Sequence, residues 1–314
     1  MSVEERIVEV MGTTAHVVVT EGVAGLADRA VEHLEDLEAR WSRFRPDSEI
    51  SRLNERVGVP VLVSRSTYEL VDHALQGRRL TEGRFDPTLL DALCAAGYDR
   101  SFELLGTVDA PPSVAGRHQA PARVHVQDPE PIRLDPITGT VWLAPGTQFD
   151  PGGIGKGFAA DVVVDFVLAE GARGALVNVG GDLRAEGMAP EGSGWVVAVT
   201  DPNHPDRIVS TVALEAGAVA STWRTKRTWT APDGSPRHHL IDPSTGLPAT
   251  TGLAGVTVLA GRGWQAEVLA KAAFLAGPSE GAGLLAANDA AGLLFADDGT
   301  VHEAGAWADF GACI

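Results

Sequence analysis

The sequence predicts an α+β fold, on the strength of three observations. Short β-rich segments occur in groups, the helical segments stand apart from them, and no regular βαβ rhythm runs through the chain. Grouped strands with segregated helices favour α+β over a doubly wound parallel sheet. A chain of 314 residues with 44% hydrophobic residues can bury a sizeable core, in one large domain or in two intimate subdomains.

The N-terminal half predicts a hairpin, two helices and a loop insertion. The expected elements are strands at 7–11 and 15–20, a helix within 23–44 and a second helix near 67–80. The strands flank the turn Gly12-Thr13-Thr14, Pro46 closes the first helix, and Gly83 follows the second. The stretch 106–122 is rich in proline and glycine, which predicts an exposed insertion.

The C-terminal half predicts strands around two further helices. The expected strands are 140–143, 175–179, 195–200, 208–214 and 255–259. Helices are expected at 156–169 and 264–276, and each is followed by a glycine that ends it, Gly171 and Gly277.

Charge and cysteine content exclude several classes of function. The formal net charge of −17 repels polyanions, so we expect no general affinity for nucleic acid or for anionic membranes. Cys94 and Cys313 match no metal-ligand spacing and are interpreted as plain thiols. The N-terminal residues carry several glutamates without an apolar core, and no long apolar run follows, which predicts a cytoplasmic protein without membrane insertion.

A glycine-rich loop, FDPGGIGKGFAAD at 149–161, is the strongest candidate for a ligand site. Its glycines leave room beside the backbone, and Lys156 lies where a helix is expected to start, an arrangement that suits phosphate. The glycines are Gly152, Gly153, Gly155 and Gly157. A plain turn with a solvated lysine is the alternative. The P-loop and dinucleotide motifs do not fit, because Asp150 and Gly157 occupy P-loop positions and the glycine spacing differs from that of the dinucleotide motif.

Two shorter motifs allow both a structural and a functional interpretation. Asp86, before Pro87 in RFDPTLL, suits a turn or a helix cap as well as a site. Gly180, Gly181 and Asp182 follow an expected strand, where they form either a tight turn or backbone that passes close to a ligand.

Two further motifs carry titratable side chains. His238 and His239 precede a short apolar strand; histidines in such places are more often structural, but strand alternation would direct only one of the two inward, and histidine exchanges protons near neutral pH. Glu267 and Lys271 stand four residues apart on an otherwise apolar helix. An exposed ion pair of this kind stabilises a helix by only about 0.3–0.5 kcal/mol. Because the rest of this helix is apolar, we expect the two charged side chains to be directed into a site.

Taken in order, these motifs resemble the ApbE family of FAD:protein FMN transferases. The motifs are MGT at 11–13, SRFRPDSEISRLN at 42–54, RFDPT at 84–88, GGIGKGFAAD at 152–161, NVGGDL at 178–183, HLIDPSTGLP at 239–248 and an AE…K helix at 266–271. Each is weak alone, but the series spans nearly the whole chain. The resemblance implies one ApbE-like domain over 1–314 with a T-fold-like arrangement of mixed sheets and packed helices.

The resemblance also implies an activity. Such an enzyme cleaves the pyrophosphate of FAD, transfers FMN to a Thr or Ser hydroxyl of an acceptor protein, and releases AMP. By this resemblance His239 is the catalytic base. The FAD-binding positions are Met11, Phe85, Asp86, Gly153, Gly155, Lys156, Gly157, Asp161, Gly180, Gly181 and Asp182.

The family's divalent metal, usually Mg²⁺, would be held at the backbone carbonyl of Val164 and the side chains of Glu267 and Lys271. Lys271 departs from the family pattern, because it stands where a threonine hydroxyl is usual and a protonated ammonium cannot ligate a cation. Three outcomes are open at this point. Lys271 turns away and magnesium binds, the ammonium replaces the cation, or catalysis is weakened. An FAD pyrophosphatase and a non-catalytic FAD-binding module are the alternative functions.

Overall fold

The structure, a computed structural model, describes residues 2–105, 130–192, 194–231 and 234–313, which fall into two compact units. The first unit is built from three stretches of chain, 1–36, 154–226 and 250–314. The second is built from 37–153 and 227–249. The insertion predicted at 106–122 lies outside the described residues.

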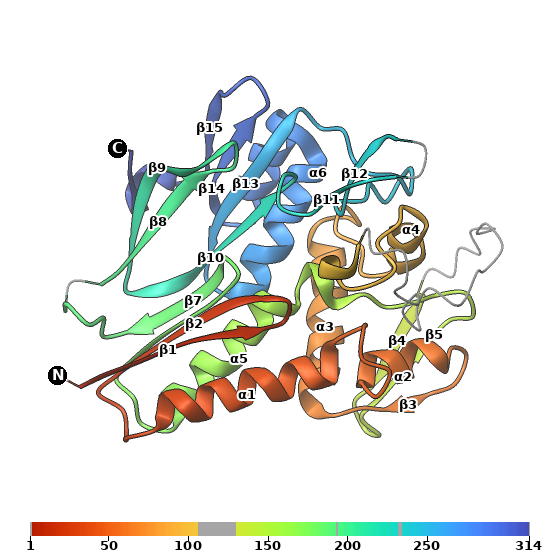
Figure 1. Cartoon of the computed structure of the whole chain (residues 1–314), viewed down its shortest axis with the longest axis horizontal. Helices are drawn as coiled ribbons and strands as arrows, with labels where there is room; N and C mark the ends of the chain where they lie inside the picture. The colour runs from red at the N-terminus through yellow and green to blue at the C-terminus, as the bar shows by residue number, and fades with distance from the viewer. Residues whose placement is uncertain (1, 106–129, 193, 232–233, 314) are drawn as a thin grey trace. The chain divides into compact units, whose positions relative to one another are not determined.

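An eight-stranded antiparallel sheet forms the centre of the first unit (Figure 1). Its strands, in spatial order, are β1 (Val3–Val10), β2 (Thr13–Thr20), β6 (Gly174–Val179), β7 (Asp182–Gly187), β10 (Ala216–Trp223), β13 (Leu253–Ala260), β14 (Ala291–Ala296) and β15 (Val301–Ala304). The α+β class is therefore confirmed. In the described part of the chain the paired strands run antiparallel rather than in a mixture of directions, and tight turns join the β1–β2 and β6–β7 pairs.

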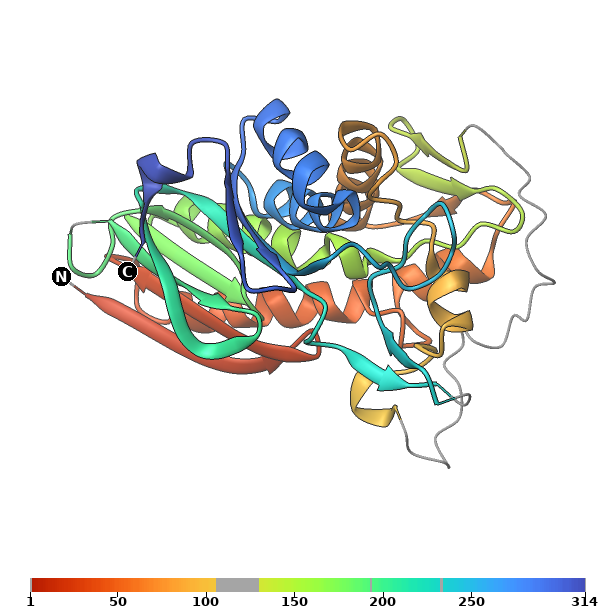
Figure 2. The ribbon, with the colours of Figure 1, turned by 90° about the horizontal axis from the view of Figure 1, so that it is seen from above.

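Two helices, α5 (Gly155–Ala169) and α6 (Gly263–Ala287), pack on one face of this sheet (Figure 2). Leu294 of β14 lies against the α6 segment at Gly281, whereas its neighbours Leu293 and Phe295 point to the opposite face, as strand alternation requires. Gly277 has φ 79° and breaks α6 just before Pro278, so the predicted helix stop is a kink after which the helix resumes.

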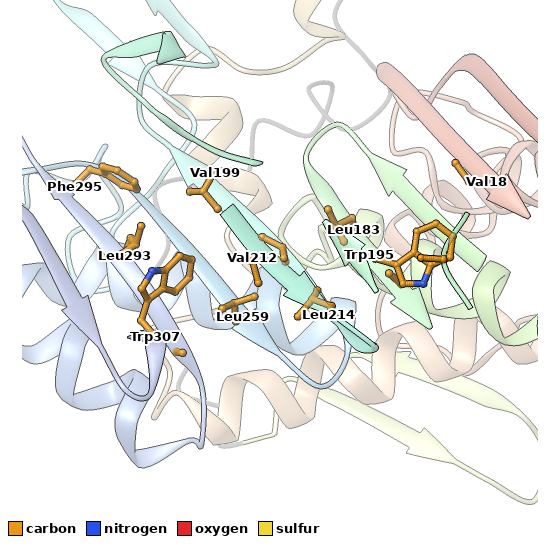
Figure 3. Packing of buried hydrophobic residues seen from close by; sticks show 14 residues of the cluster. Val18, Leu183, Trp195, Val199, Val212, Leu214, Leu259, Leu293, Phe295 and Trp307 are labelled. Carbon is orange, nitrogen blue, oxygen red and sulfur yellow. The ribbon is translucent and has the colours of Figure 1, made fainter. Parts of the chain in front are cut away.

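The opposite face of the sheet is covered by a small second sheet and a short helix. These elements are β8 (Trp195–Asp201), β9 (His204–Leu214), β16 (Gly311–Cys313) and α7 (Trp307–Phe310). Figure 3 shows Leu259, Leu293 and Phe295 of the large sheet facing Val212 and Trp307. This apolar core fixes the sheet whose turns and flanking helices carry the candidate site residues.

The second unit is mainly helical. Its elements are the end of α1 (Leu26–Trp41), α2 (Glu49–Glu55), α3 (Arg65–Leu80), α4 (Leu90–Ala95), the short helices η1 (Phe102–Leu104) and η3 (Pro151–Gly153), the sheet of β3 (Val61–Leu62), β5 (Thr140–Leu143) and β4 (Ile132–Asp135), and the hairpin of β11 (Thr228–Thr230) and β12 (Pro236–His238). Leu93, Tyr98 and Ile241 form a core cluster with Trp229 and neighbouring apolar side chains.

The predicted helices and strands are present, but the sequence did not predict three of the longer strands. Strands β7 and β10 contain polar or alanine-rich stretches whose β character depends on their neighbours in the sheet. Strand β14 is a short, fully buried apolar segment, which periodicity alone does not distinguish from part of a buried helix. The first turn also sits one residue earlier than expected, at Met11 and Gly12, both with positive φ. Among the described residues, no helix combines the length and apolarity that crossing a membrane requires.

Candidate functional site

The glycine loop leads into the first turn of α5, as the sequence predicts. Gly155, Lys156 and Gly157 form this turn, directly after Ile154. The Lys156 ammonium bonds to the Asp182 carboxylate and lies 3.6 Å from Glu267 Oε1. Three segments that the sequence singled out independently therefore meet at the start of α5.

Glu267 is enclosed by the first turn of α5 and by Lys271. Its side chain is 1% exposed; Oε2 accepts a hydrogen bond from the Gly157 N–H at 2.8 Å, and Oε1 accepts one from Lys271 Nζ at 3.0 Å. Burial acts to raise the pKa of Glu267, but Lys271, Lys156 and the Gly157 N–H outweigh it, so the pKa lies below its usual value. Lys156, Asp182, Glu267 and Lys271 together are called the ionic cluster below.

Two glycine-containing turns lie beside each other in the first unit. Met11 and Gly12 connect β1 to β2, and Gly180 and Gly181 connect β6 to β7. The Gly180 N–H donates to the carbonyl of Thr14 at 3.1 Å, and a Cβ on Gly180 would meet Thr13 Oγ1 at 2.6 Å. Glycine is needed at position 180 both for its positive φ of 64° and for this close approach.

Sequence reasoning missed one cation beside these turns, Lys226. Its Nζ donates to the Gly180 carbonyl at 3.3 Å and lies 4.8 Å from the ring centroid of Trp223. The available signal was the basic run Arg224 to Arg227, which is unusual in a strongly acidic chain.

Asp161 serves the structure of the first unit. It is fully buried, and its two oxygens accept hydrogen bonds from the N–H groups of Gly263 and Trp264 at the start of α6, at 2.8 and 3.0 Å. Arg184 and Arg262 each approach it to 3.5 Å. Burial raises the pKa of Asp161, and these neighbours act in the opposite direction. The carboxylate expected to contact FAD thus joins α5 to the N-terminus of α6.

Val164 does not join the ionic cluster. It is buried two turns beyond Gly157 along α5, about 10 Å at the helical rise of about 1.5 Å per residue. Oxygen atoms that share one Mg²⁺ lie within roughly 4 Å of each other, because each is about 2.1 Å from the ion. The three expected metal positions, Val164, Glu267 and Lys271, are therefore not one coordination sphere.

The second unit brings the RFDPT motif beside the beginning of the glycine loop. The Asp150 N–H donates to the Pro87 carbonyl at 2.8 Å, and Gly153 ends the short helix η3 that follows. Asp86 Oδ1 accepts hydrogen bonds from the backbone N–H and the hydroxyl of Thr88, so Asp86 forms a turn and not a cap of α4. Phe85 is buried, and its N–H donates to Thr81 Oγ1.

Two buried polar residues that sequence reasoning did not single out support this loop. Asn54 accepts a hydrogen bond from the Phe149 N–H at 2.7 Å and donates one to the Phe149 carbonyl at 2.9 Å. Arg43 Nε lies 3.7 Å from Asp150 Oδ1, while its guanidinium carbon lies 4.8 Å from the Tyr98 ring centroid. Both belong to the motif at 42–54. Their residue types are common on protein surfaces, and only the structure shows that these two side chains are buried.

The adjacent histidines have different surroundings. His238 Nε2 lies 3.0 Å from the Ala249 carbonyl, and its Nδ1 accepts a hydrogen bond from the Leu240 N–H, so both ring nitrogens serve the backbone. His239 Nδ1 lies 3.4 Å from the Arg227 carbonyl, to which it can only donate. A neutral His239 therefore keeps its lone pair on Nε2, the state that a general base requires.

The turn after His239 is closed by its own hydrogen bonds. Asp242 Oδ1 accepts hydrogen bonds from the N–H and hydroxyl of Ser244 at 2.8 and 2.7 Å, and the Asp242 carbonyl accepts one from the Gly246 N–H. Leu240 and Ile241, between His239 and this turn, are buried. His239 is thus attached to an anchored hairpin.

Comparison with known proteins identifies the family of the chain. The model of the ApbE family matches residues 11–295. The chain belongs to the ApbE family.

Relatives and solved structures agree with that placement. The FAD:protein FMN transferase of Treponema pallidum is 32% identical over 267 residues, which cover 80% of this chain and 71% of that protein. The FAD:protein FMN transferase of Vibrio cholerae is 29% identical over 275 residues, 87% of this chain and 79% of that one. The ApbE protein of Thermotoga maritima superposes with a TM-score of 0.84 at 26% identity, covering 98% of this chain and 99% of the other. The apo flavinyl transferase ApbE of Pseudomonas stutzeri gives a TM-score of 0.81 at 27% identity, covering 100% of this chain and 98% of the other.

Proposed function

We propose that this protein is an FAD:protein FMN transferase. The observation that carries the proposal is the family match over 11–295, which includes both the glycine loop and the motif containing His239. In the proposed reaction, a Thr or Ser hydroxyl of an acceptor protein attacks the phosphorus of the FMN half of FAD. The new P–O ester bond forms as the bond to the bridging oxygen breaks, and AMP leaves.

The roles of the residues follow from their surroundings. His239 Nε2 takes the proton of the acceptor hydroxyl, since Nδ1 faces the Arg227 carbonyl. Lys156 and the first turn of α5 provide positive charge for the pyrophosphate. The further proposed FAD-binding residues are Met11, Phe85, Asp86, Gly153, Gly155, Gly157, Gly180, Gly181 and Asp182. Asp161 contributes by positioning α6, because its oxygens are used by backbone N–H groups there.

The side chains around Glu267 show whether the residues present could bind the Mg²⁺ that the family resemblance implies. One carboxylate oxygen accepts from Gly157 and the other accepts from Lys271, and Lys271 has no lone pair for a metal while it is protonated. Val164 is too far along α5 to complete the set. These residues do not fit Mg²⁺, and no step of the proposed reaction is assigned to it.

The decisive experiment follows both halves of FAD. The purified protein is incubated with FAD in the presence and absence of candidate acceptor proteins, with AMP measured by chromatography and covalent flavin by in-gel fluorescence. Acceptor-dependent AMP release with a fluorescent acceptor band is the expected result. Free FMN and AMP without acceptor would instead identify a pyrophosphatase, and FAD left intact with every acceptor would identify a binding module.

FAD recognition has its own test by calorimetry. We expect FAD to bind more tightly than riboflavin, and Lys156→Ala to weaken FAD binding while leaving riboflavin binding nearly unchanged, because riboflavin has no phosphate for the ammonium to meet. Arg65→Ala is the control, since Arg65 is exposed on α3 and pairs there with Glu69 of the same helix. Equal losses for both ligands would remove Lys156 from the phosphate site.

A further inference from the structure

The ionic cluster is electrically balanced by the protein alone. The carboxylates of Asp182 and Glu267 are 2% and 1% exposed, and the ammonium groups of Lys156 and Lys271 lie against them. With a neutral side chain at position 271, the cluster would hold two carboxylates and one ammonium. An enclosed, uncompensated negative charge is costly, and a bound cation is one way to balance it.

Lys271 supplies that balance from within the chain. Its Nζ is 3.0 Å from Glu267 Oε1, and Lys156 Nζ is 3.6 Å from the same oxygen. A Mg²⁺ ion bound to Oε1 would lie about 2.1 Å from it and would therefore crowd two ammonium groups of like charge. The second oxygen, Oε2, already accepts the Gly157 N–H.

We propose that the ammonium of Lys271 takes the place of a divalent cation, so that this protein binds FAD and transfers FMN without magnesium. The part concerning FAD rests on the proposed function. The part concerning the metal depends only on the ionic cluster and holds for the protein without ligand. Lys271 lies on α6 one helical turn from Glu267, so the folded helix holds its ammonium group beside the Glu267 carboxylate.

Metal binding by the free protein is the first test. Mn²⁺ replaces Mg²⁺ at oxygen sites and is counted by electron paramagnetic resonance. We expect no stoichiometric Mn²⁺ site in the wild type and one new site in Lys271→Thr, which removes the ammonium and adds a hydroxyl ligand beside Glu267. Arg65→Thr, which removes the cation of an exposed i,i+4 pair, is expected to behave as wild type. A stoichiometric site in the wild type, or no gain in a folded Lys271→Thr protein, overturns the proposal.

FAD affinity with and without chelator is the second test. The wild-type Kd is expected to change less than about twofold when EDTA replaces Mg²⁺, whereas Lys271→Thr should bind FAD about tenfold more weakly in EDTA and recover in Mg²⁺, a change of about 1.4 kcal/mol. A tenfold chelator effect on the wild type contradicts the proposal. If the wild type binds no FAD under either condition, the proposed function fails, and the Mn²⁺ measurement still decides the role of Lys271.

A second variant covers the case in which Lys271→Thr does not fold by circular dichroism. Lys271→Met keeps the apolar stem and removes the charge without adding a ligand. We expect it to lose about tenfold in FAD affinity with and without Mg²⁺, since the variant has neither the ammonium nor a replacement ligand. Unchanged affinity in a folded Lys271→Met protein overturns the proposal.

Discussion

The two neighbouring histidines show how strongly one residue's surroundings set its chemistry. His238 connects the backbone at Leu240 and Ala249 through both ring nitrogens, whereas His239 turns Nδ1 to the Arg227 carbonyl. Removing a general base typically costs about 10²–10⁴ in rate. We therefore expect His239→Ala to lower FMN transfer by that factor while FAD affinity stays nearly unchanged, as measured by in-gel flavin fluorescence and calorimetry.

His238→Ala is the matched comparison. It should lower the free energy of unfolding by roughly 1–3 kcal/mol, because two backbone groups lose their partner, and it should leave the transfer rate of the folded protein within a few fold of wild type. Equal losses of transfer in the two variants, or a larger loss in His238→Ala, would reassign the base.

Cys94 provides a second prediction at the residue scale. Burial raises the pKa of its thiol to about 11, although Arg43 acts in the opposite direction. Because only the thiolate reacts with iodoacetamide, alkylation of Cys94 should remain slow at neutral pH and rise with an inflection near pH 11. Mass spectrometry of a chymotryptic or tryptic digest measures the rate at this site. An inflection at the pH of an exposed thiol would show that Cys94 is not shielded.

At the scale of elements, α5 and α6 approach closely where their first turns meet. A Cβ on Gly157 would lie 2.3 Å from the Gly263 carbonyl oxygen, and a Cβ on Gly263 would lie 2.3 Å from the Gly157 carbonyl oxygen. The same approach lets Gly157 donate to Glu267 and Asp161 accept from Gly263. Gly157 is thus required by helix packing, in addition to any contact with phosphate.

This packing predicts different results for two glycines in helices. Gly157→Ala should lower the free energy of unfolding by at least about 2 kcal/mol, since the obstructing atoms are backbone. Gly283→Ala on α6 is the control: in the described part of the chain, no atom other than those of its chain neighbours and of the adjacent α6 backbone lies within 4 Å of the place that its Cβ would take. The change should therefore be neutral or stabilising by up to about 1 kcal/mol. Urea unfolding curves give both values. A neutral Gly157→Ala would mean that the two helices can separate at little cost.

At the scale of the whole molecule, the first unit depends on chain stretches that are far apart in sequence. Strand β2 pairs with β6 from Ala15 opposite Val179 to Thr20 opposite Gly174, and Val17 and Val19 are buried. The fragment 154–314 lacks β1, β2 and the start of α1, which leaves β6 as an open edge with its apolar neighbours exposed. We expect this fragment to aggregate and to show no cooperative thermal transition by circular dichroism, in contrast to the full chain.

A cooperative transition in the 154–314 fragment, with a monomer on size exclusion, would contradict this expectation. Such a result would mean that the eight-stranded sheet can fold from its C-terminal strands alone. Fusing residues 1–36 to the fragment through a flexible linker tests the same dependence in the other direction, because recovery of cooperativity would assign the defect to the missing strands.

Local sequence patterns are sufficient for much of the fold. Apolar periodicity and a following glycine locate α5 and its end at Ala169, because both signals act within a few residues. The same signals predict the interruption at Gly277 but not the resumption of α6 after Pro278. Strand β10 is not predicted by local patterns, because its alanines, glycine and serine have low strand propensity and form a strand by pairing with β7 and β13.

The sequence by itself determined the α+β class, the family motifs and the unusual residue at position 271. Only the tertiary structure decided which charges meet. Gly157 and Glu267 are 110 residues apart in the chain, and they come together with Lys156 because α5 and α6 pack on one face of the same sheet. Asp161 accepts a hydrogen bond from the N–H of Gly263 at the start of α6. Val164 lies two helical turns beyond Gly157 on α5, which separates it from Glu267. Spacing along a chain fixes neighbours within one element, whereas pairings between elements depend on how the sheet and helices pack.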